Sequence, residues 1–131
     1  MAVAVQLNHH IVYASDPAAS ARFLTDLLGL APPTRFGPFV VVETANGVNL
    51  DFLPAEGEIS SNHYAFLVTE EEFDQILGRI RQRGLGIFAD PGAQERGEIN
   101  HHDGGRGVYW ADPDGHWLEI ITRPYGSGDE P

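Results

Sequence analysis

The stretch that decides the fold is Tyr109-Trp110-Ala111-Asp112-Pro113-Asp114-Gly115-His116-Trp117-Leu118-Glu119. Its two ends are rich in aromatic and branched side chains, which favour β-strands. Its middle, Asp-Pro-Asp-Gly, places proline and glycine where a tight turn requires them. We therefore predict a strand over 106–110, a turn over 112–115 and a strand over 116–121.

The first half of the chain carries a matching hairpin. A strand predicted over 39–43 leads into Asn46-Gly47, which is typical of a two-residue hairpin turn, and a strand over 48–52 follows. When the two turns are superposed, three pairs align: Gly47 with Gly115, Leu50 with Leu118, and Asp51 with Glu119. The match indicates that one structural unit is repeated.

The strand and helix before each hairpin are repeated as well. Residues 7–13 and 62–68 predict strands, and a helix-capping signal follows each of them. The first signal is Asp16 before Pro17, and the second is Thr69 with Glu72 in capping-box spacing. Apolar residues then recur at helical spacing: Phe23, Leu24, Leu27 and Leu28 in the first helix, and Phe73, Ile76, Leu77 and Ile80 in the second. A glycine, Gly29 or Gly84, ends each helix.

These repeats predict an α+β fold made of two tandem βαβββ modules. Module one spans about residues 5–54 and module two about 62–123, within a single domain over 1–131. The modules are expected to form a curved mixed sheet with a concave metal-binding face. Residues 126–131 are small, charged or helix-breaking, which predicts a frayed tail.

Composition excludes several kinds of chemistry. All eight cationic residues are arginine, and the chain has neither lysine nor cysteine. Schiff-base catalysis, a phosphate-loop lysine, disulfides and thiolate metal sites are therefore excluded. The formal net charge of -11 argues against binding to nucleic acid or to an anionic membrane. No signal peptide or membrane-spanning apolar run is present, which predicts a cytoplasmic protein.

Three predicted strands each carry one potential metal ligand among large apolar neighbours. The ligands are His9, His63 and Glu119. Alone, either histidine is better explained as an ordinary hydrogen-bonded side chain than as a metal ligand. Together, in a repeated unit, they predict a metal site. Two imidazoles and one carboxylate with open positions is the set favoured by non-haem Fe(II) oxygenases, although Mn(II), Zn(II), Co(II) or Ni(II) also fits.

With these residues, the chain resembles the vicinal oxygen chelate superfamily, which includes glyoxalase I, fosfomycin-inactivating thiol transferases, bleomycin-resistance proteins and extradiol dioxygenases. The resemblance covers nearly all of residues 6–123. It rests on Leu7-Asn8-His9 with Asp16, on Asn62-His63-Tyr64-Ala65-Phe66, and on the stretch 109–119. It implies that His9, His63 and Glu119 occupy the metal-ligand positions.

The chain is more closely similar to the chartreusin-pathway oxygenase group. That similarity runs through residues 97–109 and through Ile120-Ile121-Thr122-Arg123-Pro124-Tyr125-Gly126. It implies a dioxygenase, with Fe(II) as the favoured metal, acting on an aromatic or polycyclic substrate of enol or catechol type. In such a site the metal chelates two neighbouring substrate oxygens, lowers their pKa and leaves a position for dioxygen.

Asp51 is the counterpart of Glu119 in the first module. In relatives of glyoxalase I this position usually holds Glu, which is a fourth ligand and takes part in proton transfer. Asp is one methylene shorter. Two interpretations stay open, a site residue that acts as distant ligand or base, and an edge-strand carboxylate with a structural partner.

The resemblance further suggests His101, in a Gly-rich loop, as an acid/base residue, whereas His102 is as well explained as a solvated loop residue. Tyr109 is a candidate hydrogen-bond donor to a metal-bound oxygen, with a core position as the alternative. Predicted substrate contacts are Tyr13, Trp117 and Arg106. His10 and His116 point to the opposite faces from the ligands and are predicted to be structural.

Three classes of function compete. The first is the dioxygenase, with a small aromatic molecule and dioxygen as its partners. The second is a glyoxalase-like lyase or isomerase, or a thiol transferase, which would need several cations to hold a phosphonate. The third is a metal-free, bleomycin-resistance-type binding protein, which usually accompanies loss of the ligand set. Relatives commonly pair, so we expect a homodimer with two sites; the ligands of one site could come from one chain or from both.

Overall fold

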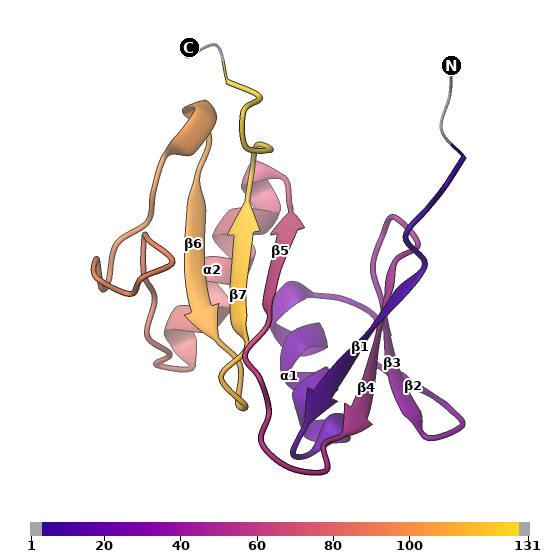
Figure 1. The fold of residues 1–131 in the computed structure, drawn as a ribbon. Coiled ribbons are helices and arrows are strands. Elements are labelled where there is room, and N and C mark those ends of the chain that lie inside the picture. The colour runs from indigo at the N-terminus through magenta and orange to yellow at the C-terminus, as the bar shows by residue number, and fades with distance from the viewer. Residues whose placement is uncertain (1–3, 129–131) are drawn as a thin grey trace. The chain divides into compact units, whose positions relative to one another are not determined.

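The computed structural model describes residues 4–128 and divides into two compact units, with the boundary between Ile59 and Ser60. Unit 1 contains β1 (His9–Ala14), α1 (Pro17–Leu28), β2 (Thr34–Phe36), β3 (Phe39–Glu43) and β4 (Asn49–Pro54) (Figure 1). Unit 2 contains β5 (His63–Leu67), α2 (Glu70–Gln82), the short 3₁₀ helix η1 (His102–Gly104), β6 (Gly107–Ala111) and β7 (Trp117–Ile121). The predicted α+β class and the tandem modules are confirmed.

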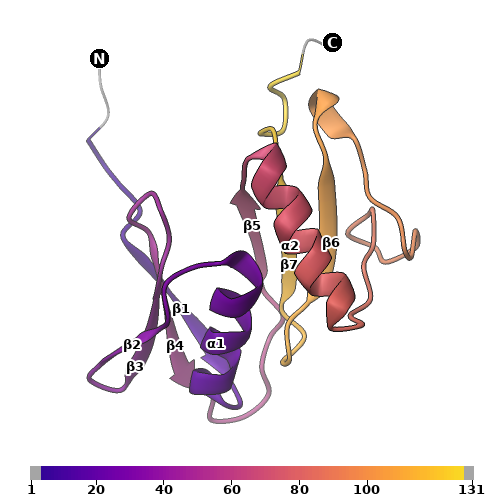
Figure 2. The ribbon, with the colours of Figure 1, turned by 180° about the vertical axis from the view of Figure 1, so that it is seen from behind.

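Unit 1 is a four-stranded mixed sheet with α1 on one face. The strand order is β1-β4-β3-β2, with β1 parallel to β4 and the other pairs antiparallel. Helix α1 begins where predicted, because the Asp16 carboxylate accepts the Ala19 N–H at 3.2 Å. It ends at Gly29, whose φ of 74° is the left-handed conformation that glycine adopts without strain. Figure 2 shows α1 in front of β1 and β4.

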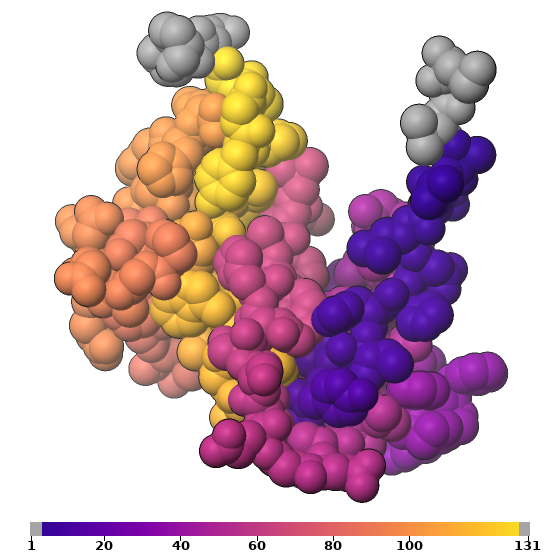
Figure 3. Space-filling model, in the orientation of Figure 1, coloured from indigo at the N-terminus to yellow at the C-terminus, as the bar shows by residue number. Residues whose placement is uncertain are grey.

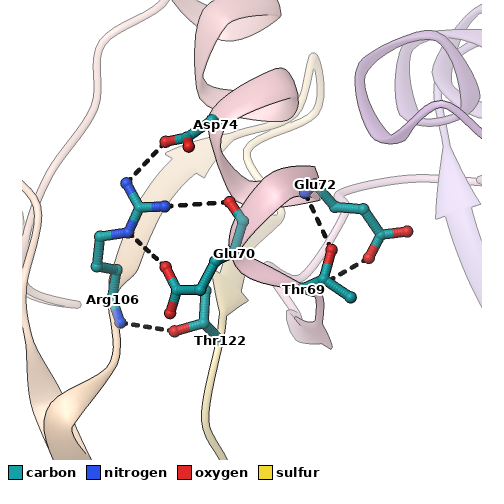
Figure 4. Close-up of polar contacts among 6 residues, drawn as sticks. All are labelled: Thr69, Glu70, Glu72, Asp74, Arg106 and Thr122. Atoms are coloured by element: carbon teal, nitrogen blue, oxygen red, sulfur yellow. Dashed lines mark hydrogen bonds and ion pairs between the residues drawn. The ribbon is translucent and has the colours of Figure 1, made fainter.

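Unit 2 repeats this plan with a three-stranded sheet of order β5-β7-β6. The predicted capping box starts α2: the Glu72 N–H donates to the Thr69 hydroxyl, and the Thr69 N–H donates to the Glu72 carboxylate (Figure 4). The four apolar residues predicted for this helix are all buried: Phe73, Ile76, Leu77 and Ile80. They cover the inner face of the sheet, where Val108, Trp110, Leu118 and Ile120 are also buried.

The strand of unit 2 that would match β2 is reduced to isolated bridges to β6, at Phe88 and at Asn100. Phe88 exchanges two backbone hydrogen bonds with Tyr109, at 3.0 and 2.8 Å. The chain then turns at Asp90, whose carboxylate accepts the Gln94 and Glu95 N–H groups. The Glu95 N–H is the main cause of the lowered pKa of Asp90. This turn includes Pro91, which cannot donate to a sheet ladder, so the strand does not extend.

The parallel strand pair of each sheet has the same register. In unit 1, His9 lies opposite Asn49, and Ile11 opposite Asp51. In unit 2, His63 lies opposite Trp117, and Ala65 opposite Glu119. The alignment of Asp51 with Glu119, inferred from the turns, therefore holds for the strand pairing of each sheet. Each helix covers one face of its own sheet: in Figure 1, α2 lies behind β5, β7 and β6, and the space-filling view of Figure 3 looks onto the opposite side of unit 2.

Part of the predicted frayed tail is ordered. The N–H groups of Gly126 and Gly128 each donate to the Asp103 carboxylate at 3.1 Å, and the Ser127 N–H bonds the Pro124 carbonyl. The small and polar composition of 126–128 predicted no packing partner, but this segment is held by polar contacts instead. Residues 129–131 of the predicted tail lie outside the described part of the chain. Neither α1 nor α2 has the length and apolar character needed to span a membrane.

Candidate metal centre

The candidate site in unit 2 lies on the face of the sheet opposite α2. Alternation along each strand determines which residues share this face. They are His63, Ala65 and Leu67 from β5, Trp117, Glu119 and Ile121 from β7, and Gly107, Tyr109 and Ala111 from β6. We refer to these nine residues as the open face of unit 2. The structure thus brings together two of the three predicted ligands.

His63 and Glu119 form a direct pair on the open face. The distance between His63 Nε2 and Glu119 Oε1 is 3.0 Å. The Glu119 side chain is fully buried, whereas 47% of the His63 side chain is exposed. Removing a carboxylate from water costs several kcal/mol unless it is paired. The pair therefore holds a buried negative charge that can be approached from the side of the histidine.

The contact made by the second ring nitrogen of His63 indicates whether the pair with Glu119 can bind a metal. Nδ1 lies 3.0 Å from the backbone carbonyl oxygen of Trp117, so it donates its hydrogen there. Both ring nitrogens therefore face acceptors, although a neutral imidazole carries only one N–H. A proton shared between Nε2 and Glu119 satisfies the pair, and a cation in the same place would do so equally. A histidine whose other N–H is fixed on a carbonyl is also the usual state of a metal ligand. The donors fit a divalent metal.

The other carboxylate oxygen of Glu119 is taken up by Tyr125. The Tyr125 hydroxyl donates a short hydrogen bond to Glu119 Oε2 and lies 3.1 Å from the Tyr109 hydroxyl. Since the only hydroxyl hydrogen of Tyr125 is on Glu119, Tyr109 is the donor to Tyr125. Burial raises the pKa of both tyrosines, and for Tyr125 the bond to Glu119 raises it further. Both hydroxyls are thus protonated near neutral pH and act as donors.

Aromatic rings line the site beside the pair. The Tyr109 ring stacks on Trp117, with centroids 5.9 Å apart and an angle of 18° between the planes. His63 stacks on Tyr109 at 5.8 Å, and Phe88 contacts Trp117 at 5.5 Å. The indole nitrogen of Trp117 is buried and has no hydrogen-bond partner among the described residues. These rings offer a flat apolar platform, on which a planar aromatic molecule can stack.

Unit 1 carries its own predicted site residues. His9, Asp51 and Tyr13 lie on the face of its sheet opposite α1, because His9 and Tyr13 alternate with the buried Val12 in β1. His9 Nδ1 lies 2.8 Å from the Asn8 side-chain oxygen. Within the described residues no hydrogen bond joins His9 to Asp51, and no three His, Asp or Glu side chains form a metal-binding group. The roles predicted for His9, Asp51 and Tyr13 stay predictions.

Arg106 lies outside the open face. Its guanidinium bonds Glu70 Oε1 at 2.7 Å, Asp74 Oδ1 at 2.8 Å and the Glu70 carbonyl at 3.1 Å (Figure 4). It also lies 4.4 Å from the centre of the Phe73 ring. Strand alternation places Arg106 with Val108 on the face that α2 covers. Arg106 therefore connects the start of β6 to α2, and its predicted contact with substrate is not among the contacts of the open face.

The other histidines of unit 2 are placed as follows. His101 is exposed at the start of η1. The ring of His102, which was the less favoured of the two, lies 6.2 Å from that of Tyr125. His116 is buried and its Nδ1 accepts the Asn62 N–H at 3.0 Å, which agrees with the predicted structural role. The predicted acid/base role of His101 has no contact here that supports it.

Tyr125 is the site residue that sequence reasoning missed. In the sequence it lies within the stretch similar to the chartreusin-pathway group, directly before the segment expected to be frayed. Its signal was an aromatic residue beside proline and glycine, six positions beyond the predicted ligand Glu119. That signal gave no direction for the hydroxyl, because its partner Glu119 lies on a different segment, the strand β7.

The fold and the sequence define a family. Residues 6–120 match the model of the Glyoxalase/Bleomycin resistance protein/Dioxygenase superfamily, and the chain belongs to it. Among solved structures, oxidase ChaP-H1 is 64% identical to this chain, with a TM-score of 0.93 over 94% of this chain and 99% of that one. Oxidase ChaP-H2 is 60% identical, with a TM-score of 0.94 over 96% and 99%. Glutathione transferase FosA of Serratia marcescens is 32% identical over 87% of this chain and 78% of its own length.

Proposed function

We propose that this protein is a metal-dependent dioxygenase of the vicinal oxygen chelate type that acts on an aromatic or polycyclic enol- or catechol-like small molecule in the cytoplasm. The observation that carries the proposal is the buried Glu119 carboxylate paired with His63 Nε2 on the open face of unit 2. His9 is the third proposed ligand. Fe(II) is the proposed metal, with Mn(II), Zn(II), Ni(II) or Co(II) as alternatives.

Each part of the open face has a proposed task. When bound, the metal supplies a Lewis acid for two neighbouring substrate oxygens and a position for dioxygen. The stacked rings of Tyr109 and Trp117 orient a flat substrate against the ligands. Outside the open face, Asp51 of unit 1 is the proposed base that takes a substrate proton.

The comparisons support oxidative chemistry in particular. Two solved structures at 60% identity or above carry the name oxidase, and each is covered almost completely. The aromatic platform and the His/carboxylate donors are consistent with an aromatic substrate and a redox-active metal. The native substrate and the position of oxygen insertion are left to the experiment below.

The test is oxygen uptake by anaerobically prepared protein loaded with Fe(II), offered catechols and polycyclic phenols one at a time. Wild type is expected to consume oxygen, and Glu119→Gln to lose uptake by more than about 100-fold, beyond the loss typical of residues outside the ligand set. Glu58→Gln, which changes an exposed glutamate in the same way, serves as the matched control. Loaded wild-type protein that consumes no oxygen with any catechol or polyphenol would sink the proposal.

A thiol transferase is the second candidate, favoured by the 32% identity to the FosA protein. That chemistry on a phosphonate needs several cations around the substrate. None of the nine open-face residues of unit 2 is an arginine, and Arg106 is bonded to Glu70 and Asp74. Loss of glutathione thiol in the presence of fosfomycin and Mn(II), without oxygen uptake in the first assay, would favour this candidate.

A further inference from the structure

We propose that Tyr125 is a positioning residue for the ligand Glu119, and that Asp103 holds Tyr125 in place. The proposal rests on the metal centre described under the proposed function. It concerns residues of unit 2 only, in three segments: the strand β7, the helix η1, and the turn formed by residues 124–128.

Tyr125 leaves one carboxylate oxygen of Glu119 free for a metal. Its hydroxyl donates to Oε2, while Oε1 faces His63 Nε2 at 3.0 Å. The Tyr109 hydroxyl, 3.1 Å from that of Tyr125, donates to it and so strengthens its bond to the carboxylate. A carboxylate fixed in this way presents Oε1 as a single oxygen beside Nε2. Without Tyr125, both oxygens of Glu119 could turn toward the cation.

Apolar packing does not hold Tyr125 in position. Its side chain is 53% exposed, and the residues around it in the turn 124–128 are mostly exposed too. The turn comes from a segment whose composition predicts fraying. Some other interaction must therefore fix the ring, because ordering an exposed turn costs conformational entropy.

Asp103 supplies that interaction. Its Oδ2 accepts the Gly126 N–H and its Oδ1 accepts the Gly128 N–H, each at 3.1 Å. Both carboxylate oxygens therefore bond the backbone that directly follows Tyr125. Asp103 also adopts a left-handed φ of 55°, which costs energy in any residue except glycine and is least costly in Asn and Asp. The backbone of Asp103 is strained, and its carboxylate accepts two N–H groups of one turn. We infer that these two hydrogen bonds fix the position of the turn.

The contact between the two segments is close. A Cβ atom on Gly128 would lie 2.8 Å from the Asp103 Cα, so only glycine fits there. A Cβ on Gly105, which follows η1, would lie 2.5 Å from the Thr122 hydroxyl oxygen. The His102 ring lies against Tyr125 at 6.2 Å. Helix η1 and the turn are thus in close contact, and Asp103 is the residue of η1 whose two carboxylate oxygens both bond the turn.

The experiment measures the affinity of metal-free protein for Co²⁺ from its visible absorption, which reports coordination directly. Tyr125→Phe removes the hydroxyl alone. Asp103→Asn keeps a residue that tolerates the left-handed conformation but replaces one acceptor by a donor. Each variant is expected to bind Co²⁺ about 10- to 100-fold more weakly than wild type, with an altered absorption band. If Asp103 acts through Tyr125, the double variant binds no more weakly than Tyr125→Phe.

Two controls separate positioning from folding. Ser127→Ala lies in the same turn, removes a hydrogen bond to the Pro124 carbonyl only, and should leave the Co²⁺ affinity unchanged. Amide hydrogen exchange at Gly126 and Gly128 should speed up in Asp103→Asn but not in Tyr125→Phe. Wild-type affinity in Tyr125→Phe, or fully additive losses in the double variant, overturns the proposal while leaving the metal centre intact. Wild-type protein that binds no Co²⁺ overturns both.

Discussion

His116 and His63 serve different purposes in the same unit, and their positions in the strands decide which. His116 is 1% exposed, accepts the Asn62 N–H through Nδ1 and contacts the Tyr64 ring edge-on. It thereby fastens the turn before β7 to the start of β5. His63 is half exposed and faces Glu119 instead. One is a satisfied core residue, and the other has a ring nitrogen within reach of a ligand.

We predict that substitution of these two histidines has separable effects. His116→Ala leaves the part-buried N–H of Asn62 without its partner, which should lower the free energy of unfolding by about 1–3 kcal/mol. Its folded form should bind Co²⁺ as wild type does, whereas His63→Ala should lose binding. Urea denaturation and Co²⁺ titration check the two effects. A loss of Co²⁺ binding in folded His116→Ala protein would contradict the assignment.

Between elements, glycines mark where the segments of unit 2 approach most closely. A Cβ on Gly107 would lie 2.8 Å from the side-chain oxygen of Asn100. Asn100 in turn donates to the Ala89 carbonyl at 2.8 Å, so it cannot move away without breaking that bond. Gly78, on α2, has no atom within 4 Å of an added Cβ. A methyl group added by alanine would therefore be crowded at Gly107 and would meet open space at Gly78.

We predict opposite signs for glycine-to-alanine substitution at these positions. Gly107→Ala should destabilise unit 2 by about 1–3 kcal/mol through overpacking against Asn100. Gly78→Ala should stabilise the protein by about 0.5–1 kcal/mol, because alanine is the better helix former. Thermal and urea denaturation of the two variants measure the difference. Equal effects at both sites would show that the contact with Asn100 is not tight.

Arg106 connects β6 to α2 through Glu70 and Asp74 (Figure 4). The pKa of Glu70 is lowered, first by its hydrogen bond with Thr122 and then by that with Arg106. A carboxyl group whose folded-state pKa is lowered stabilises the fold above its unfolded pKa. This contribution disappears as the pH falls through the folded-state value. Because these groups are mostly exposed, the contribution is modest.

We predict that the stability difference between wild type and Glu70→Gln depends on pH. The difference should be constant well above the ordinary glutamate pKa of about 4.3, and it should shrink as the pH falls below that value toward the lowered folded-state pKa. Urea denaturation over a pH series provides the measurement. Glu71→Gln is the matched control, since Glu71 is in the same helical turn and is not bonded to Arg106. A difference that grows on acidification would contradict the sign.

For the molecule as a whole, the repeat explains how much could be predicted from sequence. The two turns aligned Asp51 with Glu119, and the strand registers have the same alignment. Helix caps at Asp16 and Thr69 were also correct, because caps and turns depend on neighbouring residues. Strand alternation then placed His63 and Glu119 on one face. These features could be predicted because they depend only on neighbouring residues and on the alternation of side chains along a strand.

The remaining features depend on contacts between distant segments, which a single sequence does not encode locally. Tyr125 bonds Glu119, and the turn that follows Tyr125 bonds Asp103, which lies 22 positions earlier in the sequence. Alternation grouped Arg106 with Val108 and Trp110, but it did not tell which face α2 covers. The loss of the strand at Phe88 likewise follows from a turn held by the Asp90 carboxylate.

We propose that the protein forms a homodimer with two sites, as relatives in this superfamily commonly do. Light scattering of the purified protein should give a mass of about twice the 14.3 kDa of the chain. The formal charge of -11 implies repulsion between copies, so dimerisation should strengthen when salt is added. A monomer mass at all salt concentrations would refute the dimer.

The surroundings of Trp117 give the protein an optical reporter of its own site. The chain has two indoles: Trp110 is fully buried beneath α2, and Trp117 stacks on Tyr109 on the open face. A paramagnetic ion held by His63 and Glu119 would lie close to Trp117 and quench its fluorescence. Trp110→Phe should therefore retain quenching by Co²⁺, and Trp117→Phe should lose most of it. Metal entry can thus be followed as a loss of emitted light, with no label attached.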